Sequence, residues 1–142
     1  MPNQGVTKWG IWALLIICLG QGLYIYISSP SRPDPSKVVS VTKVGEGGAI
    51  YEVLYDTGGA TVADVYRYFL MDIQPSDEAA LLKSKNSYPF LVTKSSNAVR
   101  EVVEDKVKLK TNNTVYEFHS ISIFKTNGEV QMVSFDLDAT TP

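Results

Sequence analysis

Residues 54–72, "LYDTGGATVADVYRYFLMD", carry the most informative β-strand pattern of the sequence. Its second part, residues 61–72, alternates along the chain with a period of two, which predicts a β-strand. One face would carry Val62, Tyr66, Tyr68 and Leu70, and the other Val65, Phe69 and Met71. Because both faces are largely apolar, we expect this strand to lie at a central position in its sheet.

The glycine pair Gly58-Gly59 raises the question of a ligand-binding loop. Residues 56–59 lie between two β-type runs and are rich in residue types that supply positive φ angles in hairpin turns. A phosphate-binding loop needs a helix N-terminus that directs its amides at the anion, whereas here a strand is expected to follow. We therefore interpret residues 56–59 as a turn.

Towards the N-terminus, two further strands are expected on either side of the glycine-rich residues 45–48. Val39 and Val41 mark the first, and residues 50–55 mark the second. Towards the C-terminus, "QPSDEAALLKSKN", residues 74–86, predicts a short helix. Ser76 supplies a start signal, acidic residues follow in the first turn, and lysines lie near the end.

The remaining sequence is again strand-like. Expected strands cover residues 88–94, 106–111, 114–125 and 129–138, and residues 126–128 form a hairpin signal, Thr-Asn-Gly. Residues 98–104 fit either a helical turn or a strand. The predicted fold class is mainly β within α+β, a small antiparallel β-sheet domain of about seven strands with one short helix, preceded by a transmembrane helix.

The transmembrane helix is predicted from "WGIWALLIICLGQGLYIYI", residues 9–27, which contains no charged residue. At about 1.5 Å per residue this run spans roughly 28 Å, close to the hydrocarbon thickness of a bilayer. Aromatic residues lie near both ends, as is typical of membrane interfaces: Trp9, Trp12, Tyr24 and Tyr26. The alternative is a cleaved signal peptide, with Lys8 as its charged part and residues 20–22 as a small-residue cleavage site.

A tether, "SSPSRPDPSK", follows at residues 28–37, and its prolines and serines favour an extended chain. The expected organisation is an N-terminal tail and anchor at residues 1–27, the tether, and a β-rich domain at residues 38–142. The positive charges that flank the anchor are nearly balanced. We expect a single-pass protein of a bacterial inner membrane, with a cytoplasmic N-terminus and a periplasmic C-terminal domain.

Composition narrows the classes of function. A net charge of -2 and a pI near 5.3 argue against nucleic-acid binding. Cys18, the single cysteine, lies in the apolar run, so the rest of the chain has no disulfide and no thiol nucleophile. His119, the single histidine, is interpreted as a half-buried structural residue on a strand. We expect no enzymatic activity and no cofactor or metal.

Two groups of residues are candidates for contact with a protein partner. Lys106, Lys108 and Lys110 alternate along one strand, which puts their ammonium groups on one face. They form either an ordinary solvated face or a docking surface for an acidic partner. The second group is Tyr66-Arg67-Tyr68, because tyrosine and arginine are favoured at interfaces. Core packing with hydroxyls at the rim is its alternative interpretation.

Three sequence features together resemble small, uncharacterised, membrane-anchored envelope proteins of Gram-negative enterobacteria. The features are Gly58-Gly59-Ala60-Thr61 followed by Tyr66-Arg67-Tyr68, then Pro89-Phe90-Leu91-Val92-Thr93, all behind an N-terminal anchor. Some of these proteins look like immunity proteins encoded beside contact-dependent or type VI secretion toxins. The resemblance covers a minor part of the chain and assigns no functional residue.

Two functions are therefore expected as alternatives. The first is a membrane-anchored periplasmic binding protein, in particular an immunity protein that neutralises a secreted antibacterial toxin by direct contact. The second is a structural or assembly subunit of a bacterial envelope complex, in which Gly20, Gln21 and Gly22 contribute to contacts between membrane helices.

Overall fold

A computed structural model describes residues 4–28, 33–56 and 63–140 of the 142-residue chain. The chain divides into two compact units, Met1–Arg32 and Pro33–Pro142. The first contains the helix α1 (Gln4–Ser28), and the second contains the shorter helix α2 and all the strands that the structure describes.

The helix α1 is long and apolar enough to cross a membrane between Lys8 and Ser28. None of the apolar segment is buried against other residues of the chain. The helix ends at Ser28, two residues before Pro30, which is consistent with the bias against helical backbone immediately before a proline. A segment of this length and composition supports the predicted single membrane-spanning helix.

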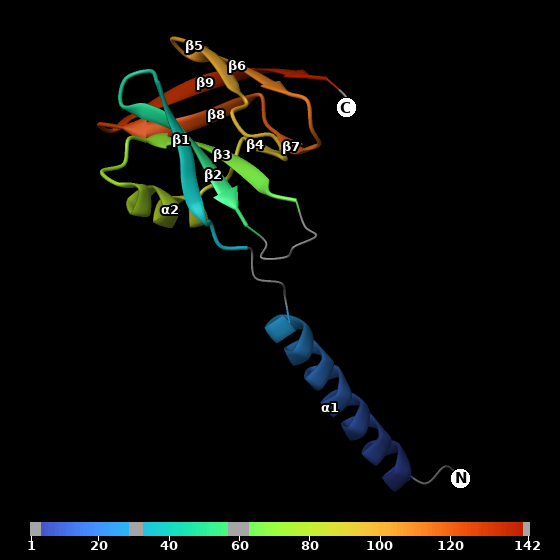
Figure 1. Cartoon of the computed structure of the whole chain (residues 1–142). Coiled ribbons are helices and arrows are strands. Elements are labelled where there is room, and N and C mark those ends of the chain that lie inside the picture. The colour runs from blue at the N-terminus through green and yellow to red at the C-terminus, as the bar shows by residue number, and fades with distance from the viewer. Residues whose placement is uncertain (1–3, 29–32, 57–62, 141–142) are drawn as a thin grey trace. The chain divides into compact units, whose positions relative to one another are not determined.

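The second unit contains a five-stranded antiparallel sheet, here called sheet A, with strand order β1-β2-β3-β4-β7 (Figure 1). Its strands are β1 (Lys37–Val44), β2 (Gly48–Tyr55), β3 (Val65–Asp72), β4 (Leu91–Thr93) and β7 (Val115–Phe118). The prediction that the tyrosine-rich strand is central is confirmed, because β3 is the middle strand.

A four-stranded sheet, sheet B, packs against sheet A and has the order β5-β6-β9-β8. Its strands are β5 (Val99–Val103), β6 (Lys106–Thr111), β8 (Ile121–Thr126) and β9 (Glu129–Ala139). The β6–β9 pair is parallel and the other pairs are antiparallel. Sheet B is therefore mixed, which the expectation of an antiparallel sheet did not include.

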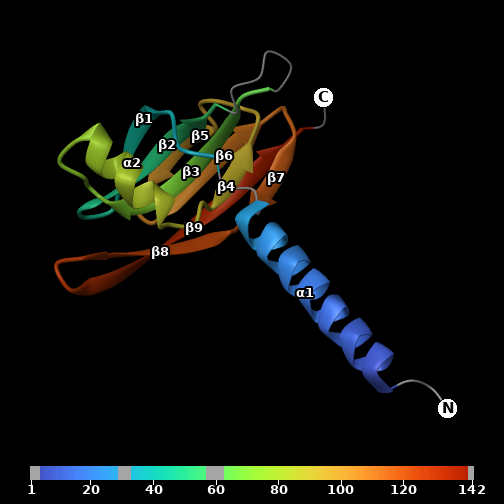
Figure 2. The same ribbon diagram turned by 90° about the horizontal axis from the view of Figure 1, so that it is seen from below.

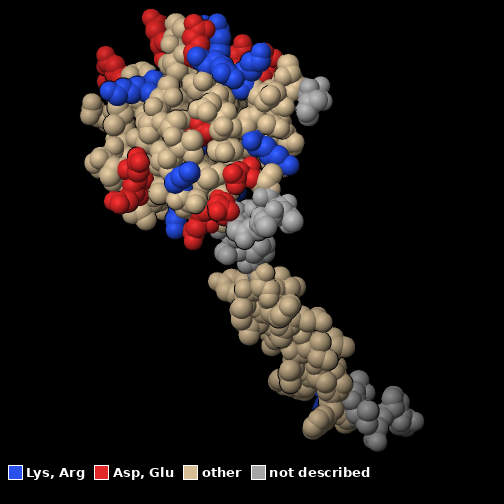
Figure 3. Space-filling model, viewed as in Figure 1, with Lys and Arg blue, Asp and Glu red and all other residues tan. Residues whose placement is uncertain are grey.

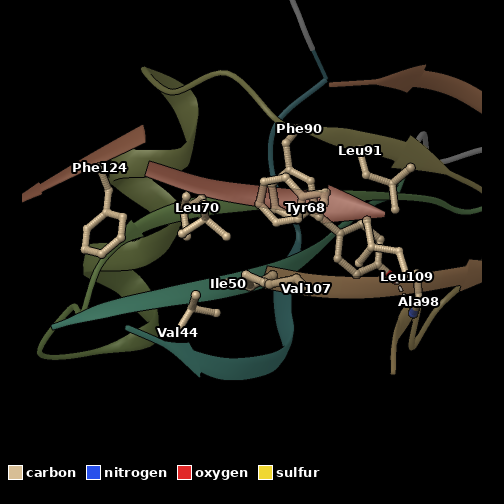
Figure 4. Packing of buried hydrophobic residues seen from close by; sticks show 12 residues of the cluster. Val44, Ile50, Tyr68, Leu70, Phe90, Leu91, Ala98, Val107, Leu109 and Phe124 are labelled. Atoms are coloured by element: carbon tan, nitrogen blue, oxygen red, sulfur yellow. Dashed lines mark hydrogen bonds between the residues drawn. The ribbon is translucent and has the colours of Figure 1, made fainter. Parts of the chain in front are cut away.

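The main hydrophobic core lies between the two sheets (Figure 4). Tyr68 and Leu70 of β3 point into it, where they meet residues of sheet B such as Phe124. The other face of sheet A packs against α2 (Asp77–Lys85), with Phe69 and Met71 in a second buried cluster. The unit thus has three layers, with α2 and sheet B on opposite sides of sheet A (Figure 1).

The predicted class is confirmed: an apolar N-terminal helix precedes a mainly β, α+β domain with one short helix. Local start and turn signals are confirmed too. The Ser76 hydroxyl accepts a hydrogen bond from the Ala79 amide at 3.2 Å and caps α2. Asn127 and Gly128, between β8 and β9, have φ angles of 50° and 84°, as a tight hairpin requires.

Several element predictions were wrong in detail. The described residues contain nine strands, and the strand expected over residues 114–125 is two strands, β7 and β8, in different sheets. Residues 98–104 form a strand, and the expected strand at residues 88–94 shortens to β4. Residues 57–62 lie outside the described residues, so the turn assigned to Gly58-Gly59 stays a prediction.

Candidate functional site

The predicted membrane-interface aromatic residues all lie on α1 and are strongly exposed. Trp9 and Trp12 are near its N-terminal end, and Tyr24 and Tyr26 are near its C-terminal end. Helical geometry separates Trp9 from Tyr26 by about 26 Å along the axis. The arrangement suits side chains that would lie at the two surfaces of a bilayer.

The lysine stripe has the predicted geometry, because the lysines of β6 are exposed and the residues between them are buried. Its surroundings, however, are acidic. The Lys108 ammonium lies 2.7 Å from the Glu101 carboxylate on β5, and this hydrogen bond and the charge raise the Lys108 pKa. The Lys110 ammonium lies 3.7 Å from Asp138 on β9.

The register of the strands explains why acidic side chains lie beside these lysines. Lys108 pairs with Asp136 on the parallel strand β9, and Lys110 pairs with Asp138. Figure 3 shows basic and acidic side chains side by side at the top of the domain, where Figure 1 labels β5 and β6. Lys106, Lys108 and Lys110 therefore belong to a surface of mixed charge, which favours the solvated-face interpretation over a docking surface for an acidic partner.

The second candidate group, Tyr66-Arg67-Tyr68, is divided between two faces of β3. Tyr68 is 0% exposed, so it belongs to the core and cannot contact a partner in this structure. Tyr66 is partly buried against the same core. The Arg67 guanidinium lies 4.2 Å from the centroid of the Tyr55 ring, a cation–π geometry. The core-packing interpretation thus describes this group better than a partner surface does.

A buried polar network lies beside Tyr68. The Tyr68 hydroxyl donates to the Ser95 carbonyl oxygen at 2.9 Å and accepts from the Ala98 amide at 3.1 Å. Glu52, 1% exposed on β2, accepts hydrogen bonds from the Ser40 hydroxyl at 2.7 Å and the Asn97 amide at 3.0 Å. The bonds to Ser95, Asn97 and Ala98 hold the segment in which the chain passes from sheet A to sheet B.

This network was not predicted from the sequence, although β2 contained its signal: one carboxylate within the apolar strand "GAIYEVLY". Because the network is enclosed and its groups are engaged in hydrogen bonds, its role is structural.

His119 lies elsewhere than predicted. It is on the connection between β7 and β8, and its side chain is 57% exposed, so the half-buried strand position was wrong. Its Nε2 atom lies 2.8 Å from Glu117 Oε1. The two residues line a surface groove of about 460 Å³, whose lining residues are Tyr88, Pro89, Phe90, Glu117, His119, Ile121, Ser122 and Ile123.

This groove combines an apolar wall with one carboxylate, one imidazole and two hydroxyl groups, those of Tyr88 and Ser122. A serine, a histidine and a glutamate on one groove invite comparison with nucleophilic catalysis, which needs the histidine hydrogen-bonded to the nucleophile. Within the described contacts, His119 Nε2 faces Glu117, and no hydrogen bond joins it to Ser122. The arrangement is better suited to bind an apolar segment that carries a positive charge.

The groove was not predictable from the sequence, because its residues come from separate segments, 88–90 and 117–123. Those segments are brought together by the change of sheet between β7 and β8. Among the described residues, no three His, Cys, Asp or Glu side chains are grouped so that they could hold a metal ion. Comparisons with protein families, curated proteins and solved structures found no match to this chain.

Proposed function

We propose that the chain is a membrane-anchored protein-binding module. In this proposal α1 anchors it in a bacterial inner membrane, its N-terminus is cytoplasmic, and the β domain contacts another protein in the periplasm. The observation that carries the proposal is the apolar surface of α1, which is exposed from Lys8 to Ser28. A bilayer covers such a surface at far lower free energy than water does.

Binding by the β domain is supported by a second exposed apolar surface. Ile121 and Ile123 of β8 and Val130 and Met132 of β9 are each more than half exposed on the outer face of sheet B. We call these four residues the β8–β9 patch. The patch adjoins the groove through Ile121 and Ile123. Contiguous apolar side chains of this kind on a soluble domain are typical of interaction surfaces.

The specific partner we propose is a secreted antibacterial toxin, which the module would neutralise by direct contact. This part rests on the resemblance to immunity-like envelope proteins. Such neutralisation works by occlusion, so it needs no cofactor and no turnover. Protection should then require a stoichiometric amount of the protein on the same side of the membrane as the toxin.

A growth-competition assay against a toxin-producing neighbour tests the proposal. The full chain should protect, whereas a form without residues 1–28, retained in the cytoplasm, should not. Ile121→Asp should reduce protection, because a charge in the β8–β9 patch opposes apolar contact. Val103→Asp is the matched control, because Val103 is 54% exposed and Ile121 is 55%, but Val103 lies on the opposite edge strand of sheet B.

Equal protection by the cytoplasmic form would contradict the periplasmic site of action. Equal loss in both aspartate variants at equal abundance would show that the β8–β9 patch is not the contact surface.

A structural or assembly role in an envelope complex is the second candidate. It is supported by Gly20 and Gly22, beside which there is open space for a neighbouring helix, and by the exposed amide of Gln21 between them. Gln21→Leu should disrupt a helix-mediated complex in native membrane electrophoresis without changing toxin protection. Loss of protection without loss of any complex favours the first candidate.

A further inference from the structure

The strand β8 differs from the other edge strands of the domain. The edges of the two sheets are β1 and β7 in sheet A and β5 and β8 in sheet B. Pairing of β1 and of β5 is interrupted by register shifts, and β7 has only four residues. Such irregular or short edges discourage pairing with another chain. β8 has six residues and regular pairing with β9 throughout.

The register also shows which backbone groups of β8 are directed outwards. The Ser120 carbonyl oxygen accepts a hydrogen bond from the Phe135 amide at 2.7 Å. Because bonding alternates along an antiparallel pair, residues 122, 124 and 126 also bond to β9. Ile121, Ile123 and Lys125 therefore direct their amide and carbonyl groups away from β9.

Space beside this edge is open. The groove of about 460 Å³ runs along Ile121, Ser122 and Ile123. Figure 2 shows β8 along the border of the domain, with no further strand beside it. The side chains of Ile121, Ile123 and Lys125 are exposed on the outer face of sheet B. An added strand would thus find both free backbone groups and apolar side chains.

We propose that this strand is β8 of a second copy of the chain, paired antiparallel about a two-fold axis at Ile123. In that register Ile123 faces Ile123 of the second copy, and Ile121 faces Lys125 of the second copy. Every outward-directed residue then lies opposite another, so all the free amide and carbonyl groups can pair. A shift of two residues in either direction leaves some of these groups without a partner inside β8.

Charge complementarity supports the same register. Lys125 makes no ion pair within the described part of the chain. Opposite Ile121, its ammonium group would approach the groove that Ile121 shares with Glu117. The Glu117 carboxylate is 47% exposed there. The two-fold axis repeats this contact, which favours a second copy over an unrelated extended segment.

Disulfide trapping tests the axis directly. In a Cys18→Ser background, Ile123→Cys should give a cross-linked dimer of the full chain in detergent micelles, because paired residues lie within disulfide reach. The matched control is Met132→Cys, since Met132 is also 60% exposed on the same face but lies on β9. Its separation from the second Met132 would be about 14 Å. At equal concentration we expect at least about tenfold more cross-linked dimer for Ile123→Cys, because only its two sulfur atoms would lie within disulfide reach.

Two further variants test the backbone and charge contacts. Ile123→Pro removes an outward amide without removing a bond to β9, so the domain should fold and the dimer should be lost. Lys125→Glu should weaken the dimer, and Lys125→Glu with Glu117→Lys should restore it. Light scattering of the detergent-solubilised chain measures the mass, and far-UV circular dichroism checks the fold.

Equal cross-linking of the Ile123→Cys and Met132→Cys variants would overturn the proposal. So would a dimer that survives Ile123→Pro, because another surface such as α1 would then hold it. The proposal would also be overturned if the unmodified chain were monomeric and captured a different protein, and the folded Ile123→Pro variant no longer captured that protein. In that case the β8 edge would serve a different partner, and the proposed binding function would stand without the dimer.

Discussion

Gly48, the first residue of β2, lies beneath the aromatic ring of Phe124 on β8. A Cβ atom at this position would lie 2.3 Å from Phe124 Cζ. Phe124 is itself 5% exposed within the core between the sheets. The requirement for glycine here comes from this close approach of two sheets, and the local backbone does not impose it.

We predict that Gly48→Ala lowers the free energy of unfolding by about 1 to 3 kcal/mol, because the added methyl group overpacks the core. Gly128→Ala is the matched control: Gly128 has a φ of 84° and open space around it, so its cost of about 1 kcal/mol is conformational. Chemical denaturation measures both. In double-mutant cycles Phe124→Leu should offset part of the Gly48→Ala cost and leave the Gly128→Ala cost unchanged. Additivity in both cycles would contradict the steric explanation.

A substitution at Tyr68 tests how much the buried polar network contributes to stability. Tyr68→Phe removes the hydroxyl group that hydrogen-bonds to the Ser95 carbonyl oxygen and the Ala98 amide. We expect the free energy of unfolding to fall by about 1 to 3 kcal/mol, because both groups are then left without this partner. Tyr116→Phe is the control, because Tyr116 is 55% exposed and its change should stay within about 0.5 kcal/mol. A Tyr68→Phe protein as stable as wild type would show that the bonds add nothing to stability.

The same residue gives a pH dependence. Burial raises the pKa of the Tyr68 phenol well above its ordinary value, more than the Ala98 hydrogen bond lowers it. The folded chain thus holds this proton more tightly than the unfolded chain. The resulting stability is fully present below about pH 10, the pKa of an unfolded tyrosine, and is lost as pH rises towards the folded-state pKa. Above pH 10, the stability of Tyr68→Phe should fall less steeply than that of wild type, and parallel slopes would contradict this.

Among the strands, β6 shows that the effect of a charged side chain on stability depends on the residues opposite it on the neighbouring strands. Lys108 lies between Glu101 on β5 and Asp136 on β9, whereas Lys106 pairs with Ser134 and Val103. Lys108→Glu therefore places like charges on adjacent strands, and Lys106→Glu does not.

We predict a clear decrease in the Tm of the Lys108→Glu variant at low salt and little change for Lys106→Glu. The difference should shrink as sodium chloride is raised, because salt screens exposed charges. Differential scanning calorimetry at several salt concentrations measures it. A salt-independent difference would indicate a packing effect instead. Replacing all three lysines by glutamate would set like charges beside Glu101, Asp136 and Asp138, so we expect that variant to destabilise the sheet and to be a poor probe of partner binding.

Elements with strong local signals were predictable. The alternation of β6, the cap of α2 and the Asn127-Gly128 turn depend on neighbours in sequence, and all are confirmed. Residues 114–125 were not, because their alternation continues through a break at His119 and Ser120, where the chain changes sheets. Nothing local distinguishes one long strand from two strands that pair with different partners.

At the scale of the whole molecule, the main prediction concerns the fate of α1. We expect the mature protein to retain it, because the apolar helix extends to Ser28, beyond the small residues at positions 20–22. The intact mass should include residues 1–28, and alkaline carbonate should leave the protein in the membrane pellet while detergent releases it. A form without residues 1–28 is the control for release. A mature chain that begins near Leu23 would contradict retention and support a cleaved signal peptide.

The sequence alone determined the features that depend on composition and local periodicity: the apolar helix, the mainly β class, the central strand β3, the Asn127-Gly128 turn and the short helix. Tertiary structure decided which alternating strands share a sheet, because a period of two specifies two faces but not the neighbour of either face. That choice buried Tyr68, set acidic side chains beside Lys108 and Lys110, and brought Tyr88, Glu117, His119 and Ile123 to one groove. It also left β8 as a regular, open edge, because pairing with β9 satisfies only alternate residues of the strand.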